Sequence, residues 1–82
     1  MITYFKFKRG IGRIADSLVE KIQADGLEAA QPYSSIYASV LNAFGVKYIA
    51  KLLTREDSSR YLELFACVNL WRVKVKREVK SC

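Results

Sequence analysis

The chain has 82 residues, of which 51% are hydrophobic and 27% are charged. This length supports one hydrophobic core, so residues 1–82 are predicted to form a single small domain, and the composition is too apolar for a disordered chain. Histidine is absent, and the two cysteines are Cys67, expected to be a buried thiol, and Cys82. These counts exclude a disulfide framework and a zinc site made of cysteine and histidine. Without a long apolar run or a signal-peptide pattern, we expect a cytoplasmic protein with no membrane contact.

The net charge of +6 is concentrated at the two ends of the sequence. Residues 1–13 and 72–82 each carry +4, or +8 together, whereas residues 14–71 carry −2. If the two ends meet in space, they create one strongly basic surface.

The first predicted element is a strand over residues 4–8, where two phenylalanines alternate with Tyr4, Lys6 and Lys8. Two glycines at positions 10 and 12 interrupt this pattern and indicate a turn from the strand into a helix. Residues 10–15 also match the G-x-G-x-x-A form of a dinucleotide-binding fingerprint, but no second β-α unit follows, so an ordinary turn is favoured. Arg9 and Arg13 beside a helix N-terminus suit the binding of an anion.

Two helices are predicted next. Apolar residues from Ile11 to Ile22 recur at spacings of three and four, and Gly26 is expected to end this helix. Leu27 to Gln31 is predicted to be a connector, and Pro32 suits the first turn of a helix that reaches Phe44. Because this second helix is apolar almost all the way round, it is predicted to lie at the centre of the fold or partly at a subunit interface. Gly45 is expected to break it before a short helical segment.

The last third of the chain allows two interpretations. Thr54 followed by Asp57 resembles a helix capping box, which favours a helix through Val68. The alternative is a strand over residues 61–68 that forms a hairpin with the next strand. That last strand is predicted by the alternation of three apolar residues with cations over residues 71–76.

These elements predict an α+β fold in which the two terminal strands pair as an antiparallel ribbon packed on three to four short helices. The apolar rows of the ribbon would face the helices, and its cations would gather on one exposed face. Cations beside an aromatic ring suit phosphates and stacked bases. The predicted nucleic-acid-binding residues are Tyr4, Lys6, Lys8, Arg9, Arg13, Arg72, Lys74 and Lys76.

The sequence thus predicts a small non-enzymatic binding module, nucleic-acid-binding or regulatory, that contacts DNA or RNA largely without regard to sequence. No catalytic residues, metal ligands or cofactor are predicted, because histidine is absent and no carboxylate pair or ligand cluster occurs at a useful spacing. One alternative is a protein-binding modulator or inhibitor that docks on an acidic partner surface, possibly as a homodimer. Another is that the lysines only protect a solvated strand edge.

Overall fold

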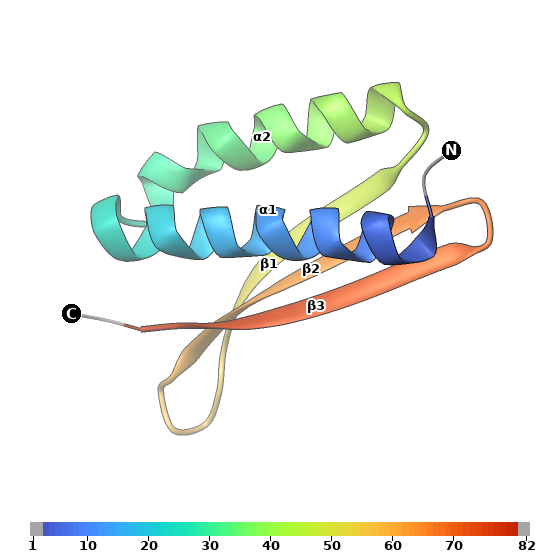
Figure 1. Ribbon diagram of the computed structural model, residues 1–82. Helices are drawn as coiled ribbons and strands as arrows, with labels where there is room; N and C mark the ends of the chain where they lie inside the picture. The colour runs from blue at the N-terminus through green and yellow to red at the C-terminus, as the bar shows by residue number, and fades with distance from the viewer. Residues whose placement is uncertain (1–2, 81–82) are drawn as a thin grey trace.

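In the computed structural model, which describes residues 3–80, two helices precede three strands (Figure 1). The elements are α1 (Tyr4–Asp25), α2 (Leu27–Ala43), β1 (Lys47–Thr54), β2 (Arg60–Val68) and β3 (Trp71–Val79). The strands form one antiparallel sheet in the order β1-β2-β3, and both helices lie on the same side of it. The predicted α+β class is therefore confirmed. The terminal ribbon is wrong, because residues 4–8 belong to α1 and β3 pairs with β2 instead. The described residues also form two helices where three to four were predicted.

The N-terminal segment is a helix where a strand was predicted. Thr3 caps it, because its side-chain oxygen accepts a hydrogen bond from the Lys6 backbone N–H at 3.2 Å. Phe7 is buried together with Ile11, four residues later, whereas Phe5 is 76% exposed. The alternation of the two phenylalanines was a coincidence over five residues, and the longer helical series of buried residues prevails over it.

Both glycines of the predicted turn lie inside α1, so the fingerprint-like motif has no loop that could hold a phosphate. A methyl group added at Gly10 would meet no atom within 4 Å. Glycine inside a helix costs about 0.5–1 kcal/mol relative to alanine, so Gly10→Ala is expected to raise the free energy of unfolding by that amount in a urea titration. Gly12→Ala is the comparison, because its added methyl would lie 3.3 Å from the Arg77 guanidinium. An equal gain in both variants would contradict this account.

A single residue, Gly26, joins the two helices into an antiparallel hairpin. Its φ of 93° and ψ of 168° belong to a region that is essentially restricted to glycine. The predicted end of the first helix is therefore confirmed, but the predicted connector is wrong, because α2 begins at Leu27 and contains Pro32 in its interior. The prediction that α2 is central is also wrong: α1 fills that place, and Ala30 is the only residue of α2 that is fully buried.

The expected break at Gly45 is confirmed, but the segment after it is the strand β1. The alternative of a strand over residues 61–68 is confirmed, since β2 spans Arg60–Val68 and forms a hairpin with β3, and the helix predicted from Thr54 to Val68 is wrong. Asp57 caps a turn instead of a helix, since its carboxylate accepts hydrogen bonds from the backbone N–H and the hydroxyl of Ser59 at 3.0 and 2.6 Å. Asn69, at φ 50°, makes the tight turn between β2 and β3.

The core lies between α1 and one face of the sheet. Leu64 of the central strand is fully buried and faces Ala50 and Val75 on its neighbours. On β3 the alternation predicted over residues 71–76 is confirmed, with Val73 buried toward the helices and Arg72, Lys74 and Lys76 on the opposite, open face. Neither described helix is long and apolar enough to cross a bilayer.

Candidate nucleic-acid interface

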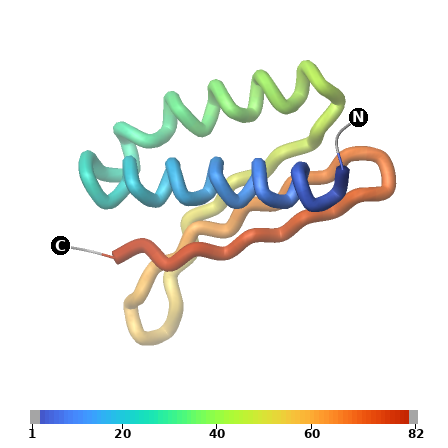
Figure 2. Tube along the Cα trace, in the orientation of Figure 1, coloured from blue at the N-terminus to red at the C-terminus, as the bar shows by residue number. Residues whose placement is uncertain are grey.

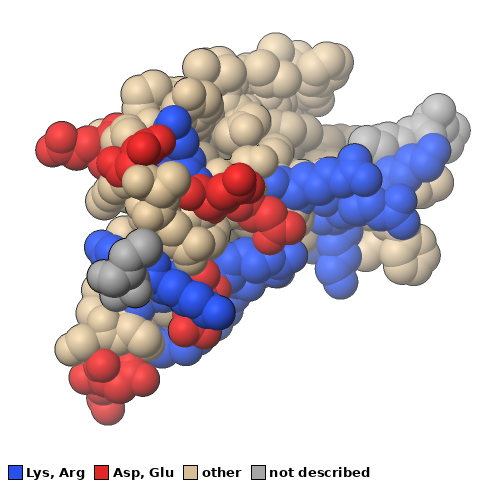
Figure 3. Space-filling model, turned by 60° about the vertical axis from the view of Figure 1, so that its left-hand side comes forward, with Lys and Arg blue, Asp and Glu red and all other residues tan. Residues whose placement is uncertain are grey.

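The helix α1 and the edge strand β3 lie side by side along much of their length (Figure 2), so the two basic ends of the chain do meet. A groove of about 400 Å³ runs between them. It is lined by Lys8, Arg9, Gly12, Arg13, Asp16, Lys74, Val75, Lys76 and Arg77. With six cations against one carboxylate, the groove has a net charge of +5. Figure 3 shows the resulting band of blue side chains beside the uncharged surface of the other helix.

Arg77 holds the two sides of this groove together. Its Nε donates to a carboxylate oxygen of Asp16 on α1 at 2.7 Å, and its Nη1 donates to the backbone carbonyl of Lys76 at 3.0 Å. Glycine at position 12 suits this close approach, since a Cβ there would make a tight contact of 3.3 Å with Nη2. Arg77 therefore positions β3 against the helix, and Gly12 leaves the room for its guanidinium group.

The open face of the sheet continues the basic surface. Lys47, Lys51 and Arg72 lie on this face with the cations of β3, and the aromatic rings of Tyr61 and Phe65 lie among them. In the register of the sheet, Phe65 stands between Ile49 and Lys74. These three residues help to line a hollow of about 210 Å³.

Lys74 lines both the groove and this hollow, so the two form one continuous surface across the edge of the sheet. The ammonium group of Lys76 lies 5.6 Å from the centre of the Tyr61 ring. Cations and partly exposed aromatic rings thus alternate at short range on the open face.

Two carboxylates reduce the positive charge of the open face: Glu63 in the central strand, and Glu78 on β3 opposite Tyr61. Glu63 Oε2 lies 3.7 Å from the ammonium of Lys74 and 4.0 Å from that of Lys76. Both lysines are more than half exposed, whereas the Glu63 side chain is only 18% exposed. Exposed pairs of this kind contribute about 0–1 kcal/mol to stability, so their main effect here is on the local charge.

The structure brings together five of the eight predicted site residues. The five that line the groove are Lys8, Arg9, Arg13, Lys74 and Lys76. Arg72 lies on the open face of the sheet, and Lys6 is exposed in the first turn of α1 but does not line the groove. Tyr4 packs edge-on against the Trp71 ring, with 5.9 Å between the ring centres.

One detail of the predicted site is wrong, and one residue of the groove was missed. Arg9 and Arg13 lie within α1, so they do not flank a helix N-terminus. The sequence reasoning also missed Arg77. Its signal was a cation at a position of β3 where the alternation of residues 71–79 calls for an apolar side chain. Cys67, predicted to be buried, is half-buried on the open face, and Cys82 lies outside the described residues.

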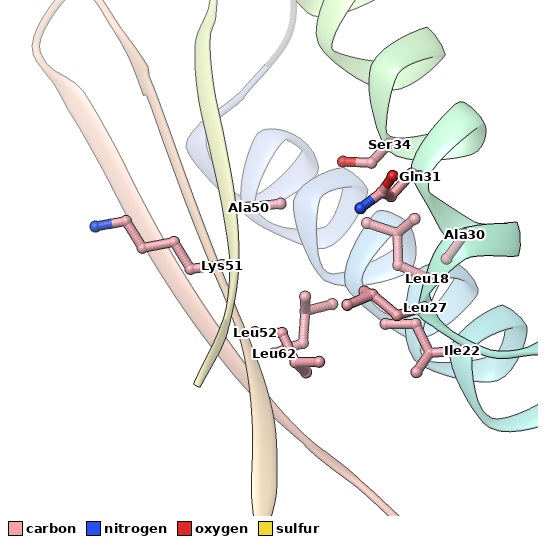
Figure 4. A pocket seen from close by; sticks show the side chains of 10 residues that line it. All are labelled: Leu18, Ile22, Leu27, Ala30, Gln31, Ser34, Ala50, Lys51, Leu52 and Leu62. Carbon is pink, nitrogen blue, oxygen red and sulfur yellow. The ribbon is translucent and has the colours of Figure 1, made fainter. Parts of the chain in front are cut away.

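A third concavity, of about 310 Å³, opens between the helical hairpin and β1 (Figure 4). Its walls are mainly apolar side chains that continue the core, such as Leu18 and Leu52, and the ammonium group of Lys51 points away from it. Nearby, burial raises the pKa of the Tyr48 hydroxyl above its usual value, and the hydrogen bond with Ser34 opposes this shift. Among residues 3–80, no three His, Cys, Asp or Glu side chains form a group that could hold a metal ion.

No protein-family model matches this sequence, and neither a curated protein nor a solved structure matches it.

Proposed function

We propose that this protein is a non-enzymatic module that binds single-stranded nucleic acid on the surface formed by the groove and the open face of the sheet. The observation that carries the proposal is the joint lining of one groove by cations from the two ends of the chain, with a single carboxylate among them. Phosphate contacts of this kind release condensed counterions and dominate non-specific affinity.

The aromatic rings of the open face favour single strands over duplexes. Phe65 and Tyr61 are partly exposed between cations, and unpaired bases can stack on such rings while the phosphates stay near the ammonium groups. The bases of a duplex are already stacked on one another. We therefore expect single strands to bind more tightly than duplexes of the same length.

The test is a titration of labelled single-stranded DNA, single-stranded RNA and duplex DNA, followed by fluorescence anisotropy at several salt concentrations. For single strands the logarithm of the association constant is expected to fall with the logarithm of salt concentration, by about 0.7 for each phosphate contacted. Arg9→Gln/Arg13→Gln is expected to reduce this slope by roughly 1.4, because two contacts are removed.

The matched control is Lys21→Gln/Arg60→Gln, which removes the same charge from residues that do not line the groove. This variant should bind nearly as well as the wild type. Equal losses in both variants would mean that net charge alone drives binding. If no nucleic acid binds even at low salt, the proposal is wrong, and an acidic protein surface becomes the partner to examine.

A further inference from the structure

The helix α2 carries an apolar stripe that is exposed among residues 3–80. Tyr33, Ile36, Val40 and the C-cap residue Phe44 follow one another at helical spacing and are 45%, 58%, 51% and 78% exposed. They present on the order of 500 Å² of surface, which matches the largest apolar patch on a typical monomer and is often functional.

The same helix is almost without charge. Glu28, in its first turn, is the only charged residue among its 17. The cations of the chain lie instead on α1 and on the sheet, and in the described part of the chain only Lys21 is recorded against the stripe, with its ammonium 5.0 Å from the centre of the Tyr33 ring at one end. Two chains of net charge +6 can therefore approach through α2 while their basic grooves stay apart.

We infer that α2 is the contact surface for a second copy of this chain. In a two-fold dimer each stripe meets the same stripe of the partner, so one apolar face supplies both sides of the interface. The contact would remove about 1,000 Å² from water, which is near the lower limit for a specific interface and predicts a dimer of modest affinity.

The side chains of α2 favour contact with a second copy of the chain over contact with a membrane. A helix that lies on an anionic bilayer carries Lys or Arg along its polar face. The polar side of α2 holds Ser35, Ser39 and Asn42 and has no cation. A contact between two neutral helix faces fits this composition.

The experiment is sedimentation velocity over a range of micromolar protein concentrations, without nucleic acid. The wild type is expected to shift from 9.4 kDa toward twice that mass as concentration rises. Ile36→Glu is expected to weaken association by about tenfold or more, because each copy would bring an unpaired carboxylate into an apolar interface. Ile49→Glu is the matched control: Ile49 is 52% exposed on the open face of the sheet, away from α2, and this variant should dimerise like the wild type.

Circular dichroism checks that each variant folds, and Val40→Ser supplies a second, uncharged change in the stripe that should also weaken association. The inference is overturned if the wild type stays at 9.4 kDa at every concentration, or if Ile36→Glu and Val40→Ser dimerise as the wild type does. Because nucleic acid is absent from the experiment, failure here is separate from failure of the proposed function.

Discussion

Leu64→Ala is expected to lower the free energy of unfolding by about 2–5 kcal/mol, the usual cost of truncating a fully buried leucine. Leu64 is 0% exposed in the central strand and packs in the layer beneath α1. A chain of this size has a total stability on the order of 4–12 kcal/mol, so this one change removes a large part of it. The backbone of β2 is paired on both sides, which limits how far it can shift to fill the cavity.

Urea titration followed by the fluorescence of Trp71, the single tryptophan, measures this loss. Trp71 contacts Phe7 and Tyr4 of α1, so its emission reports on the packing of the helix against the sheet. Leu70→Ala is the control, because it makes the same chemical change at a side chain that is 96% exposed and should alter stability by less than about 0.5 kcal/mol. Equal effects in the two variants would contradict the assigned core.

The sequence could predict elements whose periodicity is long or whose two faces differ sharply. The helix around Ile11 and Leu18 and the strand around Val73 and Val75 were both found in this way, since each buries one face and exposes the other. The hairpin after Thr54 was ambiguous, because a hydroxyl followed by an acid suits a turn as well as a helix start. The pairing of β2 with both neighbouring strands decides in favour of a strand over a helix.

The candidate site was predicted in part for a related reason. Juxtaposition of the two basic ends did not require the correct secondary structure, because α1 packs beside β3 much as a paired strand would. The secondary structure does, however, decide which of the cations face the groove. Lys6 was grouped with Lys8 by strand alternation. On a helix, residues at positions i and i+2 are separated by about 200° around the axis, so the two side chains point in different directions. Arg77 was assigned to no face, because its role rests on contacts with Gly12 and Asp16, far away in the sequence.

Removing cations from both walls of the groove is expected to have the largest effect on binding. The variant Arg9→Gln/Arg13→Gln changes α1, and Lys74→Gln/Lys76→Gln changes β3. If all four contact phosphates, the combined variant should bind single strands about 10²–10³-fold more weakly near 0.1 M salt, and each pair should supply roughly half of this change on a logarithmic scale. All four side chains are exposed, so stability should change little.

Anisotropy titrations of the wild type, the two pairs and the combined variant form a cycle that measures whether the walls act together. Glu63→Gln should move affinity in the opposite direction, because it frees Lys74 and Lys76 from a neighbouring carboxylate. If the α1 pair accounts for the whole loss and the β3 pair has no effect, nucleic acid contacts the helix alone. The groove would then not be a shared surface, and its cations on β3 would serve only to keep the sheet edge soluble.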